Sequence, residues 1–210
     1  MLLIRTKSRA FLLGALAVAL ATQPALAQFS DSYNFLKAVD DRDGAEAEKY
    51  ISEPGSVIIN TKRDGTGETA LHLVVARKDD TWLGYLLQKG ANPNLADRKG
   101  VSPLMLATQL GFTEGVLRLL KYKASVDATN RSGETALIRA VQLRQPELVR
   151  ILLKAGANPD KRDSVAGLSA REYAAQDGRN SAILAIIERG GQADEPKKSG
   201  ELDFSGIGEP

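Results

Sequence analysis

The sequence predicts an all-α solenoid, a stack of short helix–turn–helix units, and three observations lead to this fold class. Gly67, Gly100 and Gly133 open similar segments, so the pattern returns every 33 residues. Within each segment, apolar residues recur at spacings of three and four, as on a helix with one buried stripe. Each segment holds two such helical patterns around one turn. A unit this small cannot bury its apolar face alone, so neighbouring units must stack.

The copies share residue types at fixed positions. A fourth copy begins at Gly167, 34 residues after Gly133, with one residue inserted before it. Seven positions after each glycine stands a small residue or valine: Val74, Ala107, Ala140 and Ala174. Aliphatic pairs at positions 19 and 20 predict the buried face of the second helix: Leu86–Leu87, Leu119–Leu120, Leu152–Leu153 and Ile186–Ile187.

The outer units depart from the pattern, as the ends of a stack should. The first unit is degenerate, with helices predicted around Phe35–Ala38 and over Asp43–Ile51. In the last unit, Arg171 stands where the central units have leucine. We therefore expect about five units, over residues 31–60, 67–94, 100–127, 133–160 and 167–190.

One position at the end of the first helix holds either glycine or a long basic residue. Gly111 and Gly178 occupy it in two units, and Lys78 and Arg144 occupy it in two others. If the backbone there has positive φ, each basic residue costs about 1 kcal/mol relative to glycine.

Two short motifs resemble those of the ankyrin-repeat family. Thr69-Ala70-Leu71-His72 is similar to its Thr-Pro-Leu-His turn, and both Gly90–Asn94 and Gly156–Asp160 are similar to its Gly-Ala-Asp-x-Asn turn. The resemblance covers about residues 31–190. It implies helix–turn–helix units joined by β-hairpin fingers, and a concave surface that binds other proteins. It implies no chemistry.

Residues 1–27 have the organisation of an export signal. A basic start is followed by the apolar run Ala10–Ala21 and by Ala25-Leu26-Ala27, a small-x-small cleavage site. The alternative, a membrane anchor, needs about 20 apolar residues, and Thr22-Gln23-Pro24 ends the run too soon. We therefore expect cleavage after Ala27, a repeat domain over residues 28–190, and a disordered tail over residues 191–210, which is rich in acidic residues, glycine and proline.

Charge and cysteine content narrow the class of protein and its compartment. Without residues 1–27 the chain has 25 basic and 26 acidic side chains, a net charge of −1, which gives no general case for binding nucleic acid or a membrane surface. The absence of cysteine excludes disulfides, thiol catalysis and thiolate metal sites. An exported chain without disulfides favours a bacterial periplasm, with secretion as the second choice.

Residues able to support catalysis or hold a cofactor are scarce. His72 is the only histidine, so a Ser-His-Asp triad or a two-histidine metal site cannot form within one chain. One reading of His72 is a lone haem or metal ligand. The other, which the resemblance implies, is a structural imidazole that bridges backbone groups of adjacent turns. No glycine-rich phosphate loop is present, so we expect neither a cofactor nor enzymatic activity.

The expected fingers carry the strongest candidate for a binding surface. Seven basic residues fall in four successive fingers: Lys62, Arg63, Arg98, Lys99, Arg131, Lys161 and Arg162. They form either a solvated row of tips or a positive rim that faces an acidic partner. The resemblance also turns the ends of the first helices toward the concave face, and exposed leucines beside arginines suit an interface core. The candidate partner-binding residues are Arg63, Arg77, Arg98, Lys99, Gln109, Leu110, Arg131, Gln142 and Leu143.

These observations predict a monomeric, non-catalytic protein-binding module in the periplasm. An alternative is an accessory factor of a periplasmic haem enzyme or oxidative-stress system.

Overall fold

The computed structural model describes residues 23–52 and 57–192. Most of the expected signal segment and the expected tail from residue 193 onward lie outside these ranges. The expected cleavage site, Ala25-Leu26-Ala27, falls within the first helix. Among the described residues, no helix combines the length and apolarity needed to cross a bilayer.

The described residues form ten α-helices in five consecutive pairs, without a β-sheet. Two short 3₁₀ helices complete the set, η1 (Ile58–Asn60) after the first pair and η2 (Gly178–Asn180) within the last. The α-helices are α1 (Gln23–Asp41), α2 (Gly44–Ile51), α3 (Ala70–Ala76), α4 (Asp80–Gln88), α5 (Pro103–Gln109), α6 (Thr113–Lys121), α7 (Ala136–Gln142), α8 (Pro146–Lys154), α9 (Ala170–Gln176) and α10 (Ser181–Glu188).

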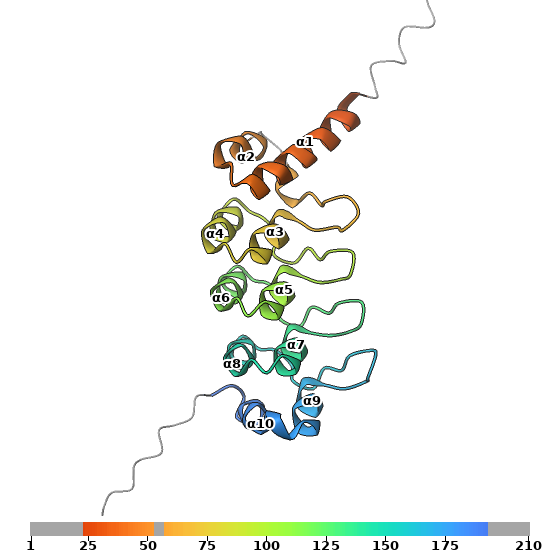
Figure 1. The fold of residues 1–210 in the computed structure, drawn as a ribbon, viewed down its shortest axis with the longest axis vertical. Helices are drawn as coiled ribbons and strands as arrows, with labels where there is room; N and C mark the ends of the chain where they lie inside the picture. The colour runs from red at the N-terminus through yellow and green to blue at the C-terminus, as the bar shows by residue number, and fades with distance from the viewer. Residues whose placement is uncertain (1–22, 53–56, 193–210) are drawn as a thin grey trace, which may run out of the picture.

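The pairs stack into an elongated solenoid with three parallel columns (Figure 1). The first helices of the pairs, α1, α3, α5, α7 and α9, form the middle column, and the second helices lie on one side of it. On the other side, the loops before α3, α5, α7 and α9 project as fingers. We number these fingers 1 to 4, over residues 61–69, 94–102, 127–135 and 160–169. Each central pair contacts the pairs directly before and after it.

The core follows the sequence pattern closely. Val74, Ala107, Ala140 and Ala174, the small residues at position seven, are all buried. Leu71, Leu104 and Leu137 fill the equivalent core position in the three central pairs. In the last pair this position holds Arg171, whose Nε lies 2.7 Å from Asp160 Oδ1. A charged pair replaces an apolar contact there, because no further unit covers the end of the stack.

The backbone at the ends of the first helices has the expected positive φ in three of the four units. Lys78 and Arg144 have φ of 54°, and Gly111 has φ of 63°, so the expected left-handed conformation is present at these three positions. Gly178 differs, because it begins η2 and does not have positive φ. The inserted 3₁₀ turn changes the connection between the last two helices.

The fingers are loops closed by side chains, and regular strands are not observed in any of them. In finger 2, Asp97 Oδ1 accepts hydrogen bonds from the amides of Lys99 and Val101, at 2.7 and 2.8 Å. Asn130 and Asp163 close fingers 3 and 4 in the same way. Isolated antiparallel bridges occur only in fingers 1 and 4 within the described ranges. The expected β-hairpins do not appear as regular strands: each finger closes through a backbone hydrogen bond such as that from the Asp97 amide to the Val101 carbonyl, and fingers 2 to 4 are also capped by a side chain.

Successive fingers are joined by one backbone hydrogen bond each. The amides of Arg98, Arg131 and Ser164 donate to Thr66, Lys99 and Ser132, with N–O distances of 2.9, 3.0 and 2.8 Å. We call this series the finger ladder. Gly100 lies directly against it, since a Cβ at this residue would approach the Arg131 nitrogen to 2.9 Å. The repeated glycine thus permits close approach of neighbouring fingers.

A second series of bonds joins the turns that follow the second helices. Asn60, Asn94 and Asp127 each accept the backbone amide of the next unit through Oδ1, at 2.8, 2.7 and 3.0 Å. These residues hold the last position of the Gly-Ala-Asn-Pro-Asn motif or its equivalent. The motif therefore sets the stacking of one unit on the next.

Candidate partner-binding surface

The seven basic finger residues divide into two groups. Four of them bond within the fold: Lys62 Nζ donates to the Ala96 carbonyl at 2.6 Å, and Lys161 Nζ donates to the Asp127 carbonyl at 2.7 Å. Arg63 pairs with Asp40 and Glu68, and Arg162 pairs with Glu172. Arg63 and Arg162 are neutralised by carboxylates, whereas Lys62 and Lys161 bond to neutral carbonyls and keep their charge, with the ammonium group held against the fold.

The other three, Arg98, Lys99 and Arg131, are exposed at the tips of the two central fingers. Their side chains make no ion pair or side-chain hydrogen bond with any described residue. The finger ladder brings them together, because the Arg131 amide donates to the Lys99 carbonyl. We call these three residues the central finger patch. It is a local cluster of three unpaired positive charges.

Of the candidates at the ends of the first helices, Arg77 is engaged by the fold. Its Nη1 donates to the Val39 carbonyl at 2.7 Å, and its Nε lies 3.2 Å from Asp79 Oδ2. The guanidinium also lies over the ring of Trp82, 5.7 Å from its centroid. This side chain therefore ties α3 to the end of α1.

Leu110 and Leu143 hold equivalent positions at the ends of α5 and α7, directly after the half-buried Gln109 and Gln142. Leu143 is 42 % exposed, and Leu110 is half-buried against the core. Gln142 accepts a hydrogen bond from Arg139 Nη1 at 2.8 Å. Because helices in contact lie about 8–10 Å apart, the two leucines form a short apolar strip across two layers.

Two further apolar residues of the same repeat as Leu110 are half-buried: Val101 in finger 2 and Leu106 in α5. Leu106 was absent from the candidate set, although its position one helical turn before Leu110 is readable from the sequence. We call Val101, Leu106, Leu110 and Leu143 the leucine strip. Since α5 has seven residues, it spans about 10 Å, and the strip lies within that distance of the base of finger 2.

Toward the C-terminal end, the same face is polar and internally bonded. The Tyr173 hydroxyl donates to Asp163 Oδ2 at 2.5 Å. Burial raises the pKa of the Asp163 carboxyl, but hydrogen bonds from Tyr173 and from three backbone amides outweigh burial and lower it. Asn130, which begins the sequon-like triplet Asn130-Arg131-Ser132, uses its amide to bond Glu134 and to close finger 3. These groups hold the loops in place.

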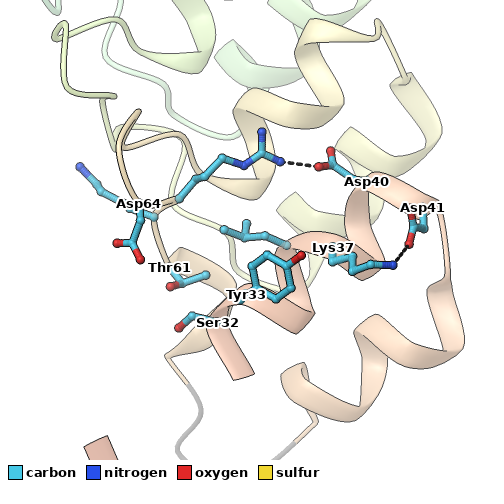
Figure 2. Close-up of a pocket in the computed structure, with 10 residues that line it drawn as sticks. Ser32, Tyr33, Lys37, Asp40, Asp41, Thr61 and Asp64 are labelled. Carbon is cyan, nitrogen blue, oxygen red and sulfur yellow. Dashed lines mark hydrogen bonds and ion pairs between the residues drawn. The ribbon is translucent and has the colours of Figure 1, made fainter. Parts of the chain in front are cut away.

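A groove of about 500 Å³ opens beside finger 1, and the repeat pattern does not predict it. It lies between α1 and the finger, with the exposed ring of Tyr33 at its centre (Figure 2). Dashed lines in Figure 2 mark the pairs Arg63–Asp40 and Lys37–Asp41. Because these charges are mutually neutralised, the groove offers mainly the exposed ring of Tyr33 together with Lys62 and Asp64 for contact.

A second groove, of about 600 Å³, lies between α2 and α4 on the side away from the fingers. Trp82 and Tyr85 line it, with ring centroids 5.5 Å apart and edge-to-face geometry. Glu48 accepts hydrogen bonds from Lys89, Tyr85 and Ser52, which lower the pKa of its carboxyl to about 2. Burial, with the bond to Glu48, raises the pKa of Tyr85 to about 12. Trp82 packs only partly into the core, because one side of its ring lines this groove.

His72 has the structural role that the resemblance implied. Nδ1 accepts from the Thr69 amide at 3.1 Å, and Nε2 lies 3.0 Å from the Val101 carbonyl. Burial lowers the pKa of this imidazole, although the bond to Val101 opposes the shift. Both ring nitrogens are occupied and the side chain is buried, so it does not face a ligand site. Clusters of three or more metal-binding side chains were not found in the described part of the chain.

The relatives of this chain come from unrelated organisms. It is 33 % identical over 118 residues to human transient receptor potential cation channel subfamily A member 1, covering 55 % of this chain and 10 % of the channel. It is 35 % identical over 113 residues to a putative ankyrin repeat-containing protein of Treponema pallidum, covering 53 % and 38 %. Human neurogenic locus notch homolog protein 4 is 40 % identical over 95 residues, covering 45 % and 5 %. The chain thus spans well under half of each relative.

The family comparison agrees with the geometry of the layers. The family described as ankyrin repeats (3 copies) matches residues 37–130 and 71–163, which together make up more than half of the chain. The matched region contains the three central helix pairs, the first two bonds of the finger ladder and the bonded His72. This chain belongs to the ankyrin-repeat family.

Proposed function

We propose that this protein is a non-catalytic binding module of about five repeats, which holds a protein partner against the central finger patch and the leucine strip. Ankyrin repeats generally mediate contacts between proteins. The observation that carries the proposal is the division of the basic residues. Four of the seven bond within the fold, two of them to carboxylates and two to backbone carbonyls, whereas the side chains of Arg98, Lys99 and Arg131 are exposed and have no such partner.

Unpaired cations beside leucines favour a partner whose surface is acidic around an apolar centre. The patch supplies long-range attraction, which raises the association rate and weakens as salt rises. The strip supplies apolar area that leaves water on binding, which mainly slows dissociation. The basic patch therefore affects mainly the association rate, and the apolar strip mainly the dissociation rate.

A double charge reversal tests the role of the patch. Arg98→Glu with Arg131→Glu is compared with Lys121→Glu with Lys154→Glu, which changes the net charge equally at exposed last-turn positions of α6 and α8. Immobilised protein is incubated with periplasmic extract at about 0.05 M and about 0.5 M salt, where screening differs strongly. We expect the finger variant to lose the captured protein at low salt and the control to retain it.

The leucine strip is tested separately with Leu143→Ala, because Leu143 is more exposed than Leu110 and its loss perturbs the core less. We expect this variant to lower capture at both salt concentrations, since apolar contact is only weakly screened. Capture that survives both changes, with helicity intact by circular dichroism, would show that the partner uses another surface.

We further propose that the chain is exported to the periplasm and cleaved after Ala27. The basic start, the twelve-residue apolar run and the small-x-small site support this proposal. N-terminal sequencing of protein from the periplasmic fraction is expected to begin at Gln28. Recovery of Met1 in the membrane fraction contradicts it.

A further inference from the structure

The groove between α2 and α4 is an opening in the row of second helices. The later neighbours in this row, α4–α6, α6–α8 and α8–α10, are in substantial contact, whereas α2 and α4 are not. Between α4 and α6, Arg118 bridges the layers, with its Nε 2.6 Å from Asp80 Oδ1. On the α2 side of the groove stand the small residues Gly44 and Ala45. A Cβ at Gly44 would have no atom within 4 Å, so this end of the groove is open.

The aromatic pair that lines the groove already has a cation near each ring. Arg77 lies over Trp82, and Lys89 lies over Tyr85, each 5.7 Å from the ring centroid. Aromatic faces attract cations, and here that attraction is satisfied within the fold. A positively charged ligand would meet like charges at both rings. The groove therefore suits an apolar ligand that is neutral or negative.

The polar groups left for a ligand are chiefly hydrogen-bond donors. The Trp82 indole N–H and the Thr81 hydroxyl make no hydrogen bond with any described residue. Arg42 uses only Nε, which lies 2.9 Å from Asp79 Oδ2, so its Nη groups have no partner in that part of the chain. Glu48, the acidic residue of the groove, already accepts three hydrogen bonds and has little capacity for more. A ligand must therefore supply acceptors.

A proline-rich segment has this combination of properties. In the polyproline II conformation the backbone makes no internal hydrogen bonds, so its carbonyls are free to accept. Proline has no N–H, so the segment needs no acceptor from the groove. Aromatic-lined grooves are a recurring binding site for such segments. The lengths also agree, because the nine residues of α4 span about 13 Å and four residues of polyproline II span about 12 Å.

We propose that the groove between α2 and α4 binds a proline-rich segment of a partner protein, with an acidic residue beside the prolines. The proline rings pack on Trp82 and Tyr85, and the indole N–H donates to a backbone carbonyl of the segment. The acidic residue pairs with Arg42, because Arg42 and Arg77 share the single carboxylate of Asp79. This site is separate from the central finger patch and the leucine strip, so it goes beyond the proposed function.

Fluorescence tests this directly, because Trp82 is the only tryptophan of the chain. The purified protein is titrated to about 1 mM, the weak end of specific affinities, with a peptide of one glutamate followed by five prolines. We expect a saturable shift of the emission to shorter wavelength, since the indole leaves water. A peptide of the same composition with alternating L- and D-proline does not form the polyproline II helix and should give no shift.

Two matched variants test the location of the site. Ala45→Glu places bulk and negative charge in the groove, at the exposed second residue of α2, and should abolish the shift. Ala182→Glu makes the same change at the exposed second residue of α10 and should leave the shift intact. Both should keep their helicity by circular dichroism, because an acidic residue is favourable in the first turn of a helix.

Arg42→Gln tests the acidic contact. This variant should bind the glutamate peptide roughly two- to fivefold more weakly, the range of an exposed ion pair. Its affinity for a peptide with glutamine in place of the glutamate should equal that of the unmodified protein. Equal loss with both peptides would remove the acidic residue from the proposed ligand.

Four results overturn the proposal of a proline-rich ligand. They are the absence of a saturable shift, an equal shift with the alternating peptide, a shift that survives Ala45→Glu, and equal loss in Ala45→Glu and Ala182→Glu. A shift caused by rising protein concentration alone would also overturn it and would assign the groove to a second copy of the chain. None of these measurements involves the fingers, so capture by the finger variants decides the proposed function separately.

Discussion

The imidazole of His72 joins two successive layers, because Nδ1 accepts from the start of its own helix and Nε2 donates to the Val101 carbonyl of the next finger. Both bonds require the neutral ring with its proton on Nε2. Burial lowers the pKa of the ring in the folded protein. In the unfolded chain the imidazole titrates near its usual value of about 6.5. Protonation therefore favours the unfolded state.

The sign of the pH dependence follows from this difference. Above about pH 6.5 the ring is neutral in both states, and its full contribution to stability is present. As the pH falls below that value the unfolded chain binds a proton first, so the free energy of unfolding decreases. We expect the urea midpoint of unfolding to decrease as the pH is lowered from about 7.5 to about 5.5. Within this range only histidine side chains ordinarily titrate.

His72→Met is the matched control, because Met105 holds the equivalent buried position in the next unit. This variant should be less stable at neutral pH but should lose the dependence on pH in this range. Parallel curves for the two proteins would show that the pH effect comes from other groups.

For the basic finger residues, the sequence predicts their positions but not their internal bonding partners. The 33-residue period places all of them at finger tips, but it cannot say which are paired. Arg63 meets Asp40, 23 residues earlier, and Lys62 meets the carbonyl of Ala96, 34 residues later. These partners depend on how α1 and the fingers pack, and on rotamers that no local spacing specifies. Sequence therefore predicted the candidate cations, and only the fold separated the three unpaired ones.

At the scale of elements, the helices were far more predictable than the fingers. Apolar spacing and capping residues fix each helix locally: Ser102 caps α5 through the Met105 amide, and Asp79 caps α4 through the Trp82 amide. Fingers 2 to 4 instead depend on one backbone hydrogen bond to the preceding finger and on one acceptor side chain each, Asp97, Asn130 or Asp163. Their shape is a property of two neighbouring units, which explains why expected hairpins became capped turns.

The repeated glycine of the finger ladder can be tested against a glycine with similar backbone geometry. Gly100 and Gly90 have φ of 79° and 93°, so alanine strains both, by about 1–2 kcal/mol. Only at Gly100 does the new Cβ also meet a neighbouring finger, at 2.9 Å from the Arg131 nitrogen, whereas Gly90 has no atom within 4 Å. We expect Gly100→Ala to cost a further 1–3 kcal/mol, roughly the range of overpacking.

Urea unfolding of both variants measures the difference directly. Gly100→Ala should also displace the amide signals of Arg131 and Lys99, whereas Gly90→Ala should leave them in place. Equal losses of stability would mean that the ladder contributes nothing beyond the strain of positive φ.

For the whole molecule, stability depends on contacts between neighbouring layers. The first helix of a central pair, such as α5, packs against its own partner α6 and against α3 and α7 on either side. The last helix, α10, packs only against α8, α9 and η2 among the pairs with substantial contact. A stack of this kind behaves as a sum of unit and nearest-neighbour terms. Damage at its centre should therefore spread in both directions, and damage at its end in one.

Leu104 in α5 and Ile187 in α10 allow this to be tested with equivalent changes, because both side chains are buried. Replacement of either by alanine is expected to cost about 2–5 kcal/mol at its own layer. In Leu104→Ala, hydrogen exchange should accelerate in α3 and α7 together, since both lose a packed neighbour. In Ile187→Ala, faster exchange should stay within α8, α9 and α10, with protection in α3 to α5 unchanged. The same exchange pattern in the two variants would contradict nearest-neighbour coupling and indicate that the domain unfolds only as one unit.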